Sequence, residues 1–122
     1  MPIVEIKTIP KPEINLLQTL PSKVATALSA SLGWPETRFV VTVETLDSKQ
    51  VQANGRKNEQ LDAGFALVRI SVAKGKSQEE SDIIVRTVAG AVANGLQIPE
   101  ELVIVCYQQQ ETGGLFAMGH YL

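Results

Sequence analysis

Two short stretches of the chain resemble each other: SLGWPETRFVVTV, residues 31–43, and NGLQIPEELVIVC, residues 94–106. In each, a glycine is followed by a proline, an acidic residue and a run of apolar residues. A glycine followed by a proline is typical of a helix end. An apolar run rich in β-branched residues is typical of a strand. The repeat therefore predicts that the chain contains the same helix-to-strand connection twice.

Apolar residues at helical spacing precede both glycines. The first set forms one stripe over about 17–32, made of Leu17, Leu20, Val24, Ala27, Leu28 and Leu32. We expect this helix to end at Gly33. The second helix is predicted over about 78–94, because Ser77 and Glu80 have the spacing of a capping box at its start. We expect Gly95 to end it.

Four segments rich in apolar and β-branched residues are predicted strands. They are residues 2–9, 38–46, 65–73 and 101–109. The polar segment after the second strand contains Asn54-Gly55, a tight-turn signal, and is expected to hold a short edge strand at about 49–53. Near the end of the chain, residues 115–122 are expected to return as a short final strand.

The order of these elements predicts one α+β domain covering residues 1–122. It consists of two tandem β-α-β pseudo-repeats, about 2–46 and 64–109, and a C-terminal hairpin segment, 110–122. Because β-α-β crossovers are right-handed, the two strands within each unit should be parallel. The prediction is a four-stranded mixed sheet with two helices on one face. The uncovered face indicates oligomerisation or ligand binding.

The composition argues against whole classes of function. The net charge is −2, and 44% of the 122 residues are hydrophobic, which disfavours a broad nucleic-acid or membrane surface. A single cysteine, Cys106, excludes an intramolecular disulfide and a multi-cysteine zinc site, and His120 is the only histidine. We therefore expect no metal and no cofactor. The chain shows no secretory signal and no apolar run of about 18–20 residues, so we expect a cytoplasmic protein.

The first residues, MPIVEI, place a proline directly after the initiator methionine. If Met1 is removed, Pro2 carries a free secondary amine. The pKa of an ordinary α-amino group is about 7.7–8.0, and that of a free prolyl amine should be higher because it is a secondary amine. An apolar pocket lowers the pKa by disfavouring the cation. Ile3, Val4 and Phe116 are candidates to line such a pocket. Two interpretations remain: Pro2 is a general base, or it only begins an edge strand, which proline tolerates.

This opening, together with the two β-α-β halves and the chain length, resembles the tautomerase superfamily. The length is similar to the branches of macrophage migration inhibitory factor and 5-carboxymethyl-2-hydroxymuconate isomerase. The stretch GFALVRISVAKGKSQEES, residues 64–81, looks like the third strand, glycine loop and helix start of the isomerase branch. The resemblance implies a homotrimeric barrel, removal of Met1, and Pro2 as the general base of a keto–enol tautomerase.

The resemblance also implies residues that bind the substrate, a small keto acid. Lys76 matches a basic residue before the second helix, where it would bind a carboxylate; the other interpretation is a solvated loop lysine. Arg38 lies near the position of an arginine that relatives use against a carboxylate or enolate. In a trimer, Phe116 would form an apolar wall near the Pro2 of a neighbouring subunit.

The sequence departs from the pattern of macrophage migration inhibitory factor at three positions. The pocket lysine of that branch falls on Trp34, and its pocket tyrosine and asparagine fall on Ile104 and Cys106. A phenylpyruvate-type pocket is therefore not expected here.

Three functions remain open from the sequence. The first is a tautomerase acting on a small 2-keto acid through Pro2. The second is a non-catalytic trimer of the same fold that binds a small ligand or a protein. The third is a ferredoxin-like regulatory or RNA-binding module, which would need exposed aromatic residues on the open sheet face. Aromatic residues make up only 5% of the chain, so the third function is the least favoured.

Overall fold

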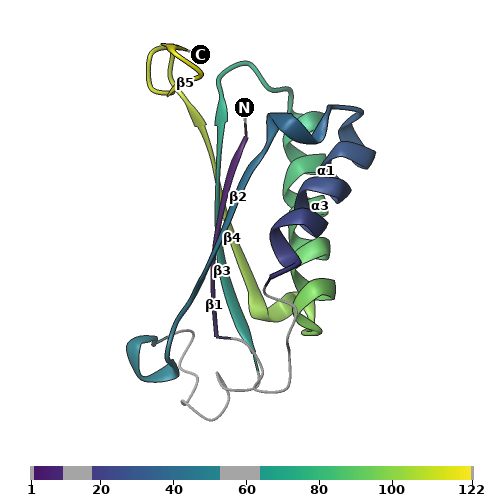
Figure 1. Ribbon diagram of the computed structural model, residues 1–122, viewed down its shortest axis with the longest axis vertical. Coiled ribbons are helices and arrows are strands. Elements are labelled where there is room, and N and C mark those ends of the chain that lie inside the picture. Colours follow the sequence, from purple (N-terminus) through teal and green to yellow (C-terminus); the bar gives the residue numbers. More distant parts are fainter. Residues whose placement is uncertain (1, 10–17, 53–63, 122) are drawn as a thin grey trace.

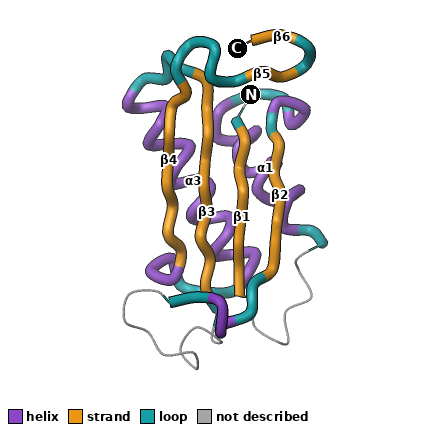
Figure 2. Tube along the Cα trace, turned by 90° about the vertical axis from the view of Figure 1, so that its left-hand side faces the viewer, coloured by secondary structure: helices purple, strands orange, loops and turns teal. Residues whose placement is uncertain are grey.

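The computed structural model describes residues 2–9, 18–52 and 64–121. Its main sheet has four strands: β1 (Ile3–Ile9), β2 (Val40–Thr45), β3 (Phe65–Ala73) and β4 (Val103–Gln110). Their order is β2-β1-β3-β4 (Figure 2). Strand β1 is parallel to β2 and antiparallel to β3, and β3 is parallel to β4. The predicted mixed sheet built from two parallel pairs is therefore confirmed.

Both long helices lie on the same face of the sheet (Figure 1). They are α1 (Leu20–Leu32) and α3 (Gln78–Leu96). The core between sheet and helices is made of aliphatic side chains, including Val4, Ile6, Leu20, Val24, Leu28, Val68, Ile70, Ile84 and Val88, all 0–1% exposed. The alternation of buried and exposed residues along β1 and β3 explains why one sheet face holds the core. The predicted α+β arrangement, with two helices on one face, is confirmed.

The starts and ends of the helices were predicted with mixed success. Ser77 caps α3, where its side chain accepts from the Glu80 N–H and the Glu80 side chain accepts from the Ser77 N–H, so the capping box is confirmed. Gly33 ends α1 in a left-handed conformation (φ 73°), as predicted. The prediction for Gly95 was wrong: α3 continues through it and ends at Gln97 (φ 57°). Glycine at position 95 lets the helix pass close to α1, because a Cβ there would lie 2.5 Å from Leu20 Cδ1 and the Leu20 side chain would have to shift.

Two strands begin later than the sequence predicted. Residues Glu36–Arg38 form a 3₁₀ turn, η1, before β2, so Arg38 is not part of the strand. Residues Glu100–Leu102 form the equivalent turn, η3, before β4. In both cases a proline precedes the turn, and its carbonyl oxygen accepts the hydrogen bond that closes it. A tight turn held in this way delays entry into the sheet by a few residues.

The segment after β2 also differs from the prediction. Residues Ser48–Gln50 form a 3₁₀ turn, η2, capped by the side chain of Asp47, in place of the start of an edge strand. The capping box of Asp47 and Gln50 satisfies backbone N–H groups that an edge strand would present to a partner. Val51 and Gln52, which belong to the predicted edge strand, are described and form no strand, so the prediction was wrong over these residues. Residue 53 and the Asn54-Gly55 turn lie outside the described residues.

The last described residues form a small hairpin of β5 (Phe116–Ala117) and β6 (His120–Tyr121). It lies within the segment 110–122, which was predicted as a hairpin segment, and it stands in place of the single returning strand predicted over 115–122. Met118 (φ 56°) and Gly119 (φ 86°) make its turn. The hairpin lies beyond the end of the sheet at which β1 begins, on the side away from the helices (Figures 1 and 2). Within the described residues, no helix is long and apolar enough to cross a membrane.

Candidate functional site

Pro2 lies at the start of β1 and is buried. Its carbonyl oxygen accepts a hydrogen bond from the Val40 N–H at 3.0 Å, so the residue just before β1 is tied to the first residue of β2. Because strand residues alternate between faces, Pro2 belongs to the same face as the buried Val4, on the helix side of the sheet. The sequence-predicted base is therefore enclosed near the end of the helix layer.

Arg38 reaches this end of the sheet from turn η1. Its guanidinium carbon lies 4.6 Å from the centre of the Trp34 ring, which is a cation–π contact. Trp34 itself stacks on Phe39, with ring centres 6.2 Å apart and an angle of 19° between the rings. The Trp34 backbone is also fixed, because its carbonyl oxygen accepts from the hydroxyl of Ser29 in α1. The aromatic ring is thus held in place between the helix end and the strand start.

Lys76 comes from the other half of the chain, in the connection between β3 and α3. Ser71 pairs with Ile3 across β1 and β3, so β3 leaves the sheet at the end where Pro2 lies. The ammonium nitrogen of Lys76 lies 5.4 Å from the same Trp34 ring centre. The structure therefore brings Lys76 and Arg38, two residues predicted from the sequence to bind substrate, onto one aromatic ring.

Neither Arg38 nor Lys76 forms an ion pair with an acidic side chain in the part of the chain that the structure describes. Within residues 2–9, 18–52 and 64–121, one ion pair lies within 4.0 Å, and it joins Lys74 to Glu111 at 3.2 Å. Glu36, which is close in sequence to Arg38, accepts a hydrogen bond from Thr26 at 2.8 Å. The site consequently presents two positive charges, and among the described residues neither has an acidic side chain within 4.0 Å, a pattern suited to a negatively charged ligand.

Trp34 and Gln109 are the members of this site that the sequence did not predict. Trp34 was noted as a departure from the resembling family, with no role of its own. The one available signal was that the only tryptophan of the sequence lies between a helix-ending glycine and a proline. Such a connection usually lies at the surface, so a large aromatic side chain there can indicate a specific contact. Gln109 gave no signal, because its partners Gly75 and Lys76 are more than thirty residues away in sequence.

Phe116 does not join the other predicted residues within one chain. It lies in β5, 60% exposed, and its ring makes an edge-on contact with the Tyr121 ring, with the centres 5.1 Å apart. Met118 and Tyr121 of the same hairpin are 81% and 69% exposed. The hairpin thus exposes large apolar side chains. It lies at the end of the sheet where β1 begins (Figure 2).

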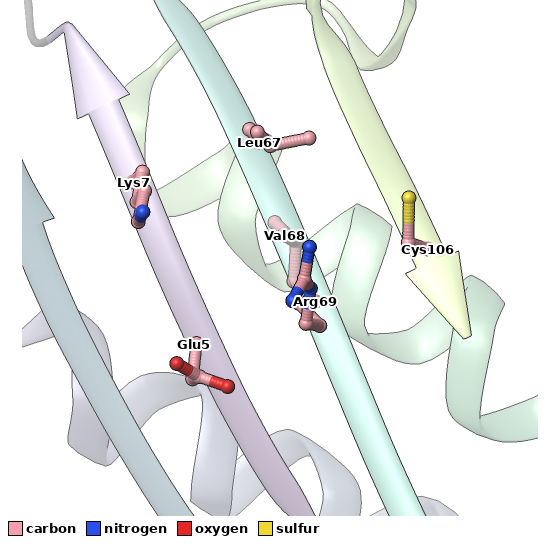
Figure 3. Close-up of a pocket in the computed structure, with 6 residues that line it drawn as sticks. All are labelled: Glu5, Lys7, Leu67, Val68, Arg69 and Cys106. Carbon is pink, nitrogen blue, oxygen red and sulfur yellow. The ribbon is translucent and has the colours of Figure 1, made fainter. Parts of the chain in front are cut away.

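The open face of the sheet carries a separate shallow hollow of about 100 Å³ (Figure 3). Arg69 stands at its centre, opposite Glu5 of β1 and beside Cys106 of β4. Cys106 is exposed and carries a free thiol. Ile104 and Cys106, two of the positions that depart from the resembling family, both belong to this open face rather than to the surroundings of Trp34 in the same chain.

Acidic, histidine and cysteine side chains are scattered over the described ranges, and no group of three or more is placed to hold a metal ion there. The candidate site consists of Pro2, the two cations and the aromatic ring of Trp34.

The chain is similar to known proteins in its fold, but its sequence identity to them is low. No protein-family model matches the chain, and no curated protein matches it. Among solved structures, native fused 4-OT has a TM-score of 0.81 at 15% identity, covering 98% of this chain and 94% of that chain. Pt0534 inactivated by 2-oxo-3-pentynoate has a TM-score of 0.82 at 15% identity, covering 97% and 93%. The macrophage migration inhibitory factor of Toxoplasma gondii has a TM-score of 0.71 at 14% identity, covering 98% and 99%.

The chain has the tautomerase superfamily fold. Its agreement with these structures extends over nearly the whole of each chain, including both β-α-β units. At this level of identity the similarity establishes the fold alone.

Proposed function

We propose that the protein is a keto–enol tautomerase of small 2-keto acids, with the amine of Pro2 as general base after removal of Met1. The observation that carries the proposal is the meeting of Pro2, Arg38 and Lys76 at one end of the sheet, with both cations on the Trp34 ring. A base beside unpaired positive charge is the arrangement that deprotonation next to a carbonyl requires.

The chemistry follows from these groups. The neutral Pro2 nitrogen takes a proton from the carbon next to the keto group, so that a C–H bond breaks and an N–H bond forms. The electron pair of the broken C–H bond forms the carbon–carbon double bond, and the π pair of the carbonyl group moves to the keto oxygen. A cationic side chain stabilises the resulting enolate. The prolinium then returns the proton to the oxygen, giving the enol, or to carbon. The proposed reaction moves one proton within the substrate by way of the Pro2 nitrogen, so it consumes no co-reactant and requires no cofactor.

Burial suits Pro2 to this role. An amine out of water is harder to protonate, which lowers its pKa and keeps more of the base neutral near neutral pH. The rate should therefore fall as pH decreases through the pKa of this amine, because the protonated nitrogen cannot accept a proton. Among the fold neighbours, Pt0534 is inactivated by 2-oxo-3-pentynoate, itself a 2-keto acid, which supports this substrate class for the fold.

We also propose that the protein works as a homotrimer. The open sheet face is left uncovered by its own helices, with Val40 40% and Leu67 37% exposed. One fused 4-OT neighbour is described as a symmetric trimer. In such an assembly the exposed Phe116 would form an apolar wall beside the Pro2 of a neighbouring subunit, which explains why a hairpin rich in large apolar side chains extends from the body of the chain.

The test combines two measurements on the natively expressed protein. Intact mass reports whether Met1 has been removed, and proton exchange or ultraviolet absorbance reports enolisation of pyruvate, 2-oxobutanoate and 2-oxopentanedioate. We expect a mass lacking Met1 and measurable turnover that drops roughly 10²-fold or more in Pro2→Ala. A mass that includes Met1 would refute the mechanism, because the Pro2 nitrogen would then be an amide without basicity.

A non-catalytic trimer that binds a small ligand or a protein is the second candidate. It is favoured by the exposed apolar side chains of the hairpin, Phe116, Met118 and Tyr121, which suit a contact surface. Retention of Met1, together with the absence of turnover on all three keto acids, would support this function over the first.

A further inference from the structure

We propose that Trp34 and Gln109 are positioning residues that hold Arg38 and Lys76 as a paired binding site for a carboxylate. The identity of the ligand as a 2-keto acid rests on the proposed function. The pairing of Arg38 and Lys76 itself is inferred from contacts within this chain. Trp34 acts on both cationic side chains, and Gln109 acts on the backbone that carries one of them.

The Trp34 ring is the shared support of the two charges. The guanidinium carbon of Arg38 and the ammonium nitrogen of Lys76 lie 4.6 Å and 5.4 Å from its centre. The two charges are therefore no more than about 10 Å apart, close to the Debye length at 0.1 M ionic strength. Like charges at this separation repel each other, and the negative face of the ring offsets part of that repulsion.

Gln109 fixes the loop that presents Lys76. Its side-chain oxygen accepts from the N–H groups of Gly75 at 3.2 Å and Lys76 at 3.1 Å. Its side-chain nitrogen donates to the Lys76 carbonyl oxygen at 3.3 Å. One amide from β4 thus binds the loop three times, and it binds Lys76 through both backbone groups. Gly75 adopts φ 101°, a conformation that a side chain would disfavour.

A second layer holds Gln109 in turn. Its nitrogen lies 3.5 Å from the Ser81 hydroxyl oxygen, and that hydroxyl lies 2.8 Å from the Tyr107 hydroxyl. Ser81 is buried in α3, so the chain of contacts begins in the core and ends at the Lys76 backbone. A flexible lysine loses much conformational freedom on binding a ligand, and fixing its loop beforehand reduces that cost.

Neighbouring Lys74 shows what the arrangement achieves. Lys74 is two residues away, 61% exposed, and paired with the carboxylate of Glu111. Lys76 has no acidic partner within 4.0 Å among the described residues and is held over the ring of Trp34 instead. The positive charge of Lys76 therefore stays available to a ligand, whereas that of Lys74 is already matched.

The first test uses Trp34 as an internal probe, because it is the only tryptophan of the chain. Its fluorescence is titrated with pyruvate, 2-oxobutanoate and 2-oxopentanedioate, with calorimetry in parallel. We expect saturable binding that weakens roughly tenfold in Arg38→Met and in Lys76→Met. Lys23→Met removes the same kind of charge from the exposed outer side of α1 and should leave binding unchanged.

The second test separates positioning from simple stability. Gln109→Met keeps the length of the side chain and removes its hydrogen bonds, so KM should rise roughly tenfold with little change in kcat. Gln109→Glu keeps an acceptor for the Gly75 and Lys76 N–H groups and should recover part of the affinity. Gln52→Met, an exposed site after η2, is the matched control. Trp34→Phe should retain most of the binding, and Trp34→Leu should lose it.

The outcomes distinguish this inference from the proposed function. Keto-acid binding is also measured in Pro2→Ala. If that variant and the wild type bind alike while neither turns over any keto acid, the paired site stands and the tautomerase proposal fails. The paired site is overturned if fluorescence and calorimetry both show no saturable binding of the three acids. It is also overturned if Gln109→Met melts normally and keeps the wild-type KM.

Discussion

The two helix-to-strand connections, 33–38 and 97–102, have similar backbone conformations but differ in the side chains that they carry. Each begins with a left-handed residue, Gly33 at φ 73° and Gln97 at φ 57°, and continues through a proline into a 3₁₀ turn. The hydrogen bond to the proline carbonyl oxygen measures 3.0 Å in both. The first connection carries Trp34 and Arg38 at the positions where the second carries Ile98 and Leu102.

The difference shows how a repeated fold acquires a single specialised end. Because β1 and β3 are antiparallel, the two connections lie at opposite ends of the sheet. The second is closed by apolar side chains, with Ile98 only 7% exposed, whereas the first supports two cations. Pro2 has its own counterpart in Ala66, whose nitrogen is a peptide amide inside the chain. The proposed general base therefore has no equivalent in the second repeat.

The largest expected effect comes from giving the first connection the side chains of the second. The double variant Trp34→Ile, Arg38→Leu should fold, because the same backbone already carries isoleucine and leucine at 97–102. Its kcat/KM for keto acids should fall roughly tenfold to a hundredfold, since one cation and the support of the other are removed. Glu101→Gln, an exposed change in the second connection, is the control. A kcat/KM within twofold of wild type would contradict the specialisation of this end.

A smaller effect is expected where the two helix ends differ. Gly95→Ala should lower the free energy of unfolding by about 1–3 kcal/mol, because its Cβ would lie 2.5 Å from Leu20 Cδ1 and Leu20 is fully buried. Gly90→Ala in the same helix meets only an exposed carboxylate at 3.4 Å and should raise that free energy by roughly 0.5–1 kcal/mol. Urea unfolding monitored by circular dichroism measures both. Equal effects at the two sites would show that Leu20 adapts.

The left-handed residues offer a finer comparison. Gly33→Ala places a side chain in open space but at φ 73°, so it should cost about 1 kcal/mol. Gln97→Gly relieves the same conformation in the second connection and should stabilise the protein by at most about 1 kcal/mol. Thermal and urea unfolding measure both variants. A similar loss of stability in the two would contradict the expectation that glycine is favoured at both left-handed positions.

The smallest effect is expected at the exposed ion pair. Glu111→Gln removes the partner of Lys74, where the side chains are 61% and 84% exposed, so the free energy of unfolding should change by less than about 0.5 kcal/mol. Keto-acid binding should also stay the same, because Lys74 belongs to neither the ring contact nor the Gln109 network. A clear loss of binding would show that this lysine, rather than Lys76 alone, contributes to the site.

Prediction from sequence succeeded where the signal was local. Helical spacing, the Ser77 capping box and the apolar strands placed the main elements, because these patterns depend on residues a few positions apart. It failed at Gly95, where a glycine near a helix end resembles a stop signal, whereas in the structure it lies inside α3, packed closely against Leu20 of the other helix. It failed also at Arg38, which a turn closed by the Pro35 carbonyl oxygen keeps out of β2.

The candidate site also combines features that the sequence predicted with features that it did not. The sequence by itself determined the two repeated units, the position of a proline at the start of the first strand, and the supply of cations at Arg38 and Lys76. Only the tertiary structure decided that these cations meet on Trp34, and that Gln109 holds the loop of one of them. The physical reason is that strand register and helix packing, set by the buried core as a whole, bring together side chains that no local pattern connects.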